Sequence, residues 1–133
     1  MNATSKLDPV ALLQRYLVAF ANRDSVLVTQ CFANGAVLEL PTVKPSRFMG
    51  LDEIRTAHRL AFENLQEVRV ETDDIVQAER SAMGAGRLTV TCRGQRETHV
   101  FGIAVESSDP GLGRVSWYFD SRGRRPWSDK AVL

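Results

Sequence analysis

The fold of this 133-residue chain is decided by residues 82–120, AMGAGRLTVTCRGQRETHVFGIAVESSDPGLGRVSWYFD. Apolar and polar residues alternate along it with a period of two, and turn-forming residues interrupt the alternation at 93–95 and 108–111. This pattern predicts β-strands joined by tight turns. With a similar run just upstream, it predicts four strands, at 68–77, 82–92, 98–107 and 114–120. The second half of the chain is therefore expected to form an antiparallel meander.

The first half has helical periodicity instead. Asp8-Pro9 is a carboxylate cap followed by a first-turn proline, and from Leu13 the apolar residues repeat at i, i+3, i+4 and i+7. Asn34-Gly35 is expected to end a second, short helix that Asp24 caps, because both residues tolerate left-handed backbone. The predicted elements are helices at 9–22, 25–32 and 51–65, a strand at 36–40 and a loop at 42–50.

Helices followed by a meander predict a single α+β domain over residues 1–133, with three N-terminal helices on one face of the sheet. The sheet must curve strongly if one face is to cover all of them. Gly84, Gly86 and Gly102 are candidate positions for a bend or a bulge.

Bulk composition excludes several function classes. The formal net charge of +1 gives no general attraction to nucleic acid or to a membrane surface. No apolar run reaches the ~20 residues that span a bilayer, and residues 1–8 do not resemble a secretion signal, so a cytoplasmic protein is expected.

Arg122, Arg124 and Arg125 are interpreted as a solvated tail rather than a phosphate site. Cys31 and Cys92 have no metal-ligand spacing and are expected to be free thiols in the core.

Six short segments together resemble the SnoaL-like and ketosteroid isomerase-like branch of the nuclear transport factor 2 (NTF2)-like superfamily. They lie in order and at suitable spacing over residues 12–120. They are Leu13-Gln14-Arg15-Tyr16, Asn22-Arg23-Asp24, the segment 31–37 (CFANGAV), the segment 50–55 (GLDEIR), Gly113-Arg114-Val115 and Trp117-Tyr118-Phe119-Asp120.

The resemblance implies an NTF2-like cone, in which a curved, mostly antiparallel sheet wraps against a long helix and leaves a conical cavity. Members of the superfamily include isomerases, cyclases, epoxide hydrolases, dehydratases and non-catalytic carriers. Function must therefore be argued from the residues of the cavity wall.

The residues of ketosteroid isomerase chemistry are only partly present. Tyr16 matches the tyrosine that stabilises the enolate oxygen, but the resemblance places Leu40 at the base position and Ile103 at the protonated acid. Neither aliphatic side chain exchanges protons. Glu39 is adjacent, but a one-residue offset in a strand points it to the other face. These replacements argue against classical steroid isomerase chemistry.

Asp120 is a second candidate base, because SnoaL-like cyclases and epoxide hydrolases of this superfamily use an aspartate on the closing strand. Two alignments of that strand remain open. One turns Asp120 and Tyr118 inward, and the other turns Trp117 and Phe119 inward. Alternatively, Asp120 caps a turn or pairs with Arg122.

Two histidines are predicted to face the sheet or the cavity. His58 lies on the apolar stripe of the third helix, four residues from Ile54 and from Phe62. It could act as an acid or base near neutral pH, or be a core residue bonded to a backbone carbonyl. His99 shares strand parity with Phe101 and Ile103, so it is an inward candidate near the rim.

The resulting site hypothesis joins Asp120 to His58, with Tyr16 donating to a developing oxyanion. Metal binding by His58, His99 and Asp120 is disfavoured because they come from separate elements, and no cofactor is expected. The expected ligand is a compact hydrophobic molecule carrying one or two oxygens. The predicted lining is Phe20, Phe32, Leu38, Leu40, Phe48, Phe62, His99, Phe101, Ile103 and Tyr118.

Three functions remain open from the sequence. The first is a cofactor-free enzyme that transfers protons on an apolar carbonyl, polyketide-like or epoxide substrate. The second is a binding module that uses the same cavity without turnover. The third is an interaction module that forms a homodimer through the exposed face of the sheet.

Overall fold

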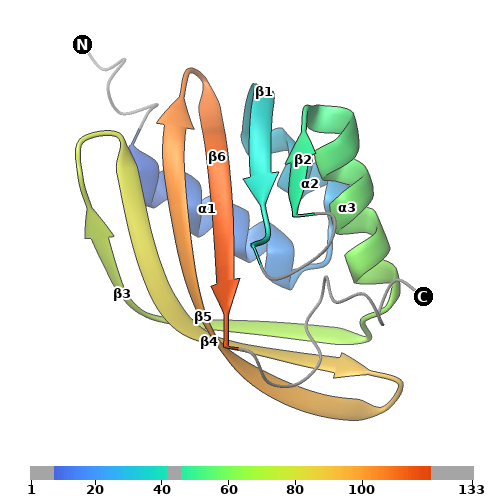
Figure 1. The fold of residues 1–133 in the computed structure, drawn as a ribbon. Coiled ribbons are helices and arrows are strands. Elements are labelled where there is room, and N and C mark those ends of the chain that lie inside the picture. Colours follow the sequence, from blue (N-terminus) through green and yellow to red (C-terminus); the bar gives the residue numbers. More distant parts are fainter. Residues whose placement is uncertain (1–7, 42–45, 121–133) are drawn as a thin grey trace.

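The computed structural model describes residues 8–41 and 46–120, and Figure 1 shows their arrangement. The elements are α1 (Pro9–Ala21), α2 (Ser25–Gln30), β1 (Phe32–Glu39), β2 (Arg47–Met49), α3 (Leu51–Glu63), β3 (Glu67–Gln77), β4 (Ser81–Cys92), β5 (Gln95–Ser108) and β6 (Gly111–Phe119). The arginine cluster at Arg122, Arg124 and Arg125 lies outside the described residues.

The strands form one six-stranded sheet in the order β2-β1-β6-β5-β4-β3. All neighbours are antiparallel except β1 and β6, which run parallel. Helix α1 crosses behind the sheet and contacts β3, β4, β5 and β6 (Figure 1). Helix α2 packs against α1, and α3 packs against α2, β1 and β2. The long strands β3, β4 and β5 bend under the helices in the same view. The predicted α+β fold, with three helices on a curved and mostly antiparallel sheet, is confirmed.

The helix starts follow from their caps. The Asp8 carboxylate accepts a hydrogen bond from the backbone N–H of Val10 at 3.0 Å, and Pro9 occupies the first turn. The Asp24 carboxylate accepts from the N–H groups of Val26 and Leu27 at 3.1 and 3.0 Å. These caps fix where α1 and α2 enter the layer that covers the sheet.

The predicted end of the second helix is wrong. Helix α2 stops at Gln30, and Phe32 already begins β1. Gly35 does adopt a left-handed backbone, with φ of 75°, but inside β1 rather than at a helix end. The register between β1 and β6 shifts between Phe32 and Val37, so the left-handed backbone of Gly35 lies within an irregular part of the strand. The predicted loop at 42–50 also contains the short strand β2.

One of the three predicted bend glycines is required by close packing. Gly86 pairs with Thr72, where the register of β3 against β4 shifts before Ile75. A Cβ atom on Gly86 would overlap the carbonyl oxygen of Glu71. A bulge therefore lies beside Gly86, as predicted, and no larger residue fits there without displacing the edge strand.

A single apolar core lies between the helices and the inner face of the sheet. Both cysteines, Cys31 and Cys92, are buried and free, as predicted. In the described part of the chain, none of the helices combines the length and apolar character needed to cross a membrane.

Candidate functional site

The inner face of the closing strands follows from their burial and register. On β5, His99, Phe101 and Ile103 are buried, and Phe101 and Ile103 pair with Phe119 and Trp117 of β6. Trp117 and Phe119 are buried, so the alignment that turns these two residues inward is the correct one.

The inward placement of Tyr118 is therefore wrong. It pairs with Gly102 on the outer face, and 49% of it is exposed. Strand alternation sends neighbouring side chains to opposite faces, so Trp117 and Tyr118 cannot both point inward.

The apolar residues predicted to line a pocket are all on the inner side of the sheet or helices. Phe48 is partly buried and packs against the core. The others are buried in it: Phe20, Phe32, Leu38, Leu40, Phe62, Phe101 and Ile103. The aliphatic replacements at Leu40 and Ile103 are thus part of the continuous core.

Tyr16 and His58 form a buried hydrogen-bonded pair. The Tyr16 hydroxyl lies 2.7 Å from Nε2 of His58, so this bond joins α1 to α3. The indole Nε1–H of Trp117 donates to the same hydroxyl at 2.9 Å, and Nδ1 of His58 lies 2.8 Å from the carbonyl oxygen of Ile54. We call Tyr16, His58 and Trp117 the core triad.

The partners fix the direction of the protons in the core triad. The Ile54 carbonyl can only accept, so Nδ1 of His58 carries the hydrogen. Burial lowers the pKa of His58 to about 4, although the bond to Ile54 opposes this effect, so the ring is neutral at pH 7. Nε2 then accepts, and the Tyr16 hydroxyl must donate to it. Burial also raises the pKa of Tyr16, with the Trp117 bond acting in the opposite direction.

Aromatic rings surround the imidazole of His58. The ring centroids of Phe20 and Phe32 are each 6.1 Å from that of His58, and the Phe62 centroid is 5.9 Å away. These apolar neighbours explain why the charged imidazolium is disfavoured. The single proton of Tyr16 is directed to His58, so donation from Tyr16 to a ligand would require this bond to break.

A second polar group lies near the start of β5, where His99 faces two carboxylates. The side chain of His99 is 2% exposed. Its Nδ1 lies 4.0 Å from Oδ1 of Asp120, and its Nε2 lies 3.4 Å from Oε1 of Glu97. The geometry at Nε2 does not make a hydrogen bond, and this buried nitrogen has no hydrogen-bond partner among the described residues. We call Glu97, His99 and Asp120 the rim cluster.

The structure groups the predicted site residues differently from the sequence hypothesis. Asp120 lies beside His99, and 41% of its side chain is exposed. His58 instead uses both ring nitrogens within the core. The alternative in which Asp120 pairs with Arg122 involves a residue outside the described part of the chain.

Neither group resembles a metal centre. Within residues 8–41 and 46–120, no three His, Cys, Asp or Glu side chains are arranged to hold a metal ion.

Sequence reasoning missed two members of these groups, Trp117 as a partner of Tyr16 and Glu97 as a neighbour of His99. A signal for Trp117 was present. Val115, Trp117 and Phe119 form an unbroken apolar set with a period of two, which marks the buried face of a strand. A signal for Glu97 was present as well, because it lies two residues before His99 on β5 and strand alternation puts both side chains on the same face.

The comparisons with known proteins agree with this fold. The family model of the SnoaL-like domain matches residues 13–115, which is most of the chain. The chain belongs to the SnoaL-like domain family. No curated protein matches it.

Solved structures with a similar fold share little sequence with this SnoaL-like protein. An NTF2-like protein of unknown function from Burkholderia pseudomallei is 20% identical, with a TM-score of 0.75, over 84% of this chain and 89% of that one. An LEH-like epoxide hydrolase from M. tuberculosis is 18% identical, with a TM-score of 0.74, over 88% and 84%. TerC, crystallised with polyporic acid, is 16% identical, with a TM-score of 0.71, over 84% and 91%. At these identities the likeness shows the fold alone.

Proposed function

We propose that this SnoaL-like protein is a cofactor-independent enzyme that transfers a proton on a small, apolar, oxygen-bearing substrate. In this proposal His99 is the base and Asp120 orients it. The observation that carries the proposal is the buried Nε2 of His99, which has no hydrogen-bond partner in the described part of the chain. Leaving a buried polar atom unsatisfied costs about 1–3 kcal/mol, and a substrate proton or hydroxyl would satisfy it.

The rim cluster has the elements of an activated base. In this proposal the Asp120 carboxylate, 4.0 Å from Nδ1 of His99, holds the hydrogen on that nitrogen, and the Glu97 carboxylate, 3.4 Å from Nε2, stabilises the ring once Nε2 has accepted a proton. Nε2 is then the lone-pair nitrogen that accepts a proton. The 4.0 Å separation is longer than a hydrogen bond, and catalytic hydrogen bonds often shorten only when a substrate binds. The Phe119 ring, with its centroid 6.4 Å from that of His99, supplies an apolar wall beside the base.

The core triad has a positioning role in this proposal. Its hydrogen bonds hold Trp117, which stacks on Phe119 with ring centroids 5.4 Å apart. Phe119 in turn contacts His99. The buried pair Tyr16–His58 thus supports the wall next to the base without exchanging protons with the substrate.

Two substrate classes fit a base at this position. A ketone with acidic hydrogens beside its carbonyl would lose one of them to Nε2. An epoxide would instead react with a water that Nε2 deprotonates. The fold similarity to an LEH-like epoxide hydrolase motivates the epoxide class.

The test uses one probe of each class, α-tetralone and 1-methylcyclohexene oxide. Exchange of the α-hydrogens of the ketone in D₂O is followed by proton NMR, and diol formation from the epoxide by gas chromatography. His99→Gln and Asp120→Asn should each lower, at least tenfold, the rate on the probe that the unmodified protein converts. Asp74→Asn, which changes an exposed carboxylate on β3, should leave that rate unchanged. Equal rates in His99→Gln and the unmodified protein would overturn the assignment of the base.

The second candidate function is binding without turnover. It is favoured by the core triad, in which the Tyr16 hydroxyl already donates to His58, so the one residue kept from the isomerase pattern is occupied. A carrier would be stabilised thermally by α-tetralone yet would exchange none of its hydrogens. That combination would support binding alone.

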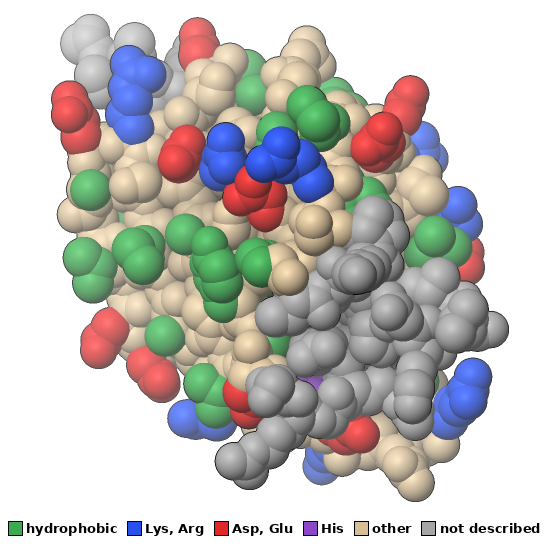
Figure 2. Space-filling model, viewed as in Figure 1, with side chains coloured by type: hydrophobic (Ala, Val, Ile, Leu, Met, Phe, Trp, Pro, Cys, Tyr) green, Lys and Arg blue, Asp and Glu red, His purple; other side chains and the backbone are tan. Residues whose placement is uncertain are grey.

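We also propose that the protein forms a homodimer through the outer face of the sheet. Figure 2 shows hydrophobic side chains gathered across this face, with charged side chains around them. Val76 and Met83, which pair across β3 and β4, are 68% and 61% exposed. Val100 and Tyr118 are large exposed residues on the neighbouring strands. Contiguous apolar surface of this kind is typical of protein interfaces.

A further inference from the structure

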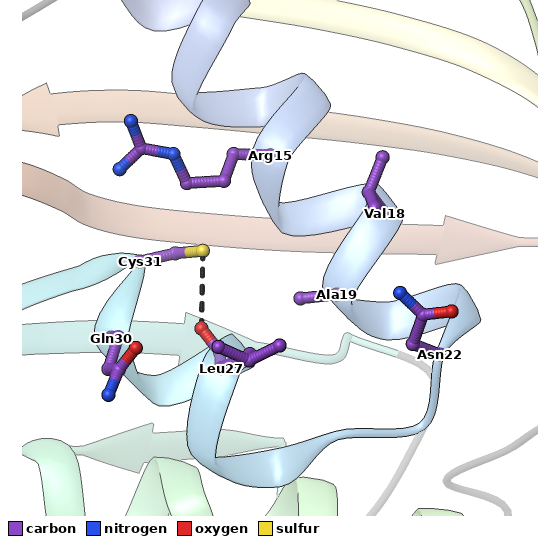
Figure 3. A pocket seen from close by; sticks show the side chains of 7 residues that line it. All are labelled: Arg15, Val18, Ala19, Asn22, Leu27, Gln30 and Cys31. Carbon is purple, nitrogen blue, oxygen red and sulfur yellow. Dashed lines mark hydrogen bonds between the residues drawn. The ribbon is translucent and has the colours of Figure 1, made fainter.

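A separate cavity lies between α1 and α2, on the side of α1 that faces away from the sheet (Figure 3). Its volume is about 180 Å³. The buried residues Ala19 and Cys31 form its floor, and the exposed side chains of Val18 and Leu27 form its walls. A cavity of about 150 Å³ is large enough to hold benzene, so this one accepts a single ring.

Polar side chains stand at the two ends of this apolar cavity. Arg15 lies on α1, and Asn22, the C-cap residue of this helix, lies seven positions further on, which is about 10 Å along the helix axis. Gln30 is the last residue of α2. In the described part of the chain, the side chains of these three residues make no hydrogen bond or ion pair. The cavity therefore offers a cation and two amides to a ligand.

The Arg15 guanidinium acts on the cavity floor. Burial raises the pKa of the Cys31 thiol, and the positive charge of Arg15 opposes this shift, as a cation near the sulfur does. The thiol stays protonated and is directed to the Leu27 carbonyl, with Sγ 3.5 Å from that oxygen (Figure 3). No acidic side chain lines the cavity as described, so nothing in its wall neutralises Arg15.

We propose that this cavity binds a small aromatic carboxylate, with the carboxylate paired to Arg15 and the ring between Val18 and Leu27. A polar substituent at the far end of the ring would meet the Asn22 amide. Arginine holds carboxylates through charge-assisted hydrogen bonds, which are stronger than neutral ones. The site is separate from the rim cluster, because its lining comes from α1, α2 and the residues that follow them and includes none of Glu97, His99 and Asp120.

The probe for this site is 4-hydroxybenzoate, titrated by calorimetry and by amide NMR shifts. We expect the shifts to centre on Ala19, Leu27 and Cys31. Arg15→Gln should weaken binding at least tenfold, because it removes the charge that pairs with the carboxylate. The matched control is Arg69→Gln, another exposed arginine, on β3, which should bind normally.

Two further measurements keep the proposal falsifiable. The neutral analogue 4-hydroxybenzamide should bind at least tenfold more weakly than 4-hydroxybenzoate to the unmodified protein. His99→Gln should bind 4-hydroxybenzoate normally, since the rim cluster is a different site. Equal affinity in Arg15→Gln and the unmodified protein, or NMR shifts centred on His99, would overturn the proposal.

Discussion

The Tyr16 hydroxyl oxygen lies 2.7 Å from Nε2 of His58, so one hydrogen bond joins α1 to α3 inside the apolar core. The Trp117 indole N–H, from β6, donates to the same Tyr16 hydroxyl, and Nδ1–H of His58 donates to the Ile54 carbonyl. Polar groups buried in a low dielectric are stabilising when each has a partner and costly when one partner is removed. Removing one hydrogen-bonding group of the core triad is therefore expected to lower the stability of the fold.

Tyr16→Phe should destabilise the protein by about 2–4 kcal/mol, because it leaves both the Trp117 Nε1–H and the His58 Nε2 without the hydroxyl. The free energy of unfolding is measured by guanidinium denaturation. The matched control is Tyr118→Phe, which removes a hydroxyl from an exposed ring and should change stability by less than about 0.5 kcal/mol. A loss below 1 kcal/mol for Tyr16→Phe would contradict the buried network.

Stability should fall as the pH decreases from 7 to 5. Unfolded His58 binds a proton near its ordinary pKa of about 6.5, whereas in the folded protein burial lowers the pKa to about 4. Between these values the unfolded state holds more protons, so acid favours unfolding. The full difference of about 3 kcal/mol is reached only below pH 4, and about 2 kcal/mol of it falls between pH 7 and 5. Unfolding experiments at pH 7, 6 and 5 measure this slope above the range in which carboxylates titrate.

Replacing each of the two histidines in turn shows which one causes the dependence of stability on pH. His58→Gln should be less stable at pH 7 and should lose most of its pH dependence between 7 and 5. His99→Gln should keep it. A slope that persists unchanged in His58→Gln would show that another group carries it.

The sequence was sufficient for the helical part of the core triad. Tyr16 and His58 fall on the apolar stripes of their helices, and a spacing of three and four residues places such side chains inward. That they meet could not be predicted, since 42 residues separate them and the contact depends on how α1 and α3 pack. The same holds for Trp117, which is 101 residues from Tyr16.

The rim cluster shows a different limit. Strand parity predicted His99 on the inner face, but Asp120 follows the last residue of β6, where alternation no longer decides direction. Its backbone N–H donates to the Val100 carbonyl at 3.2 Å, which holds it next to β5 and brings its side chain to His99. Local pattern therefore predicted each element, while the pairing of residues from separate elements required the folded chain.

Gly86→Ala should destabilise the protein by about 1–3 kcal/mol, because the added Cβ would overlap the Glu71 carbonyl oxygen at the bulge between β3 and β4. Gly102→Ala is the matched control in a neighbouring strand, since the nearest atom to its Cβ is the Gly84 carbonyl oxygen at 3.9 Å. Thermal unfolding of both variants tests the difference. Similar melting temperatures would mean that the edge strand shifts at no cost.

Met83→Lys should convert the proposed dimer to a monomer. The side chain lies on the outer face beside Val76, and a lysine there would place two like charges against each other in a symmetric interface. Sedimentation velocity at micromolar concentration measures the mass directly. The control is Val26→Lys, which also adds a lysine at an exposed apolar position. Val26 lies on α2, in the helical layer and not on the outer face of the sheet. The sheet-face interface is supported if the unmodified protein and Val26→Lys are dimers and Met83→Lys is a monomer. If Met83→Lys remains a dimer, the contact lies elsewhere.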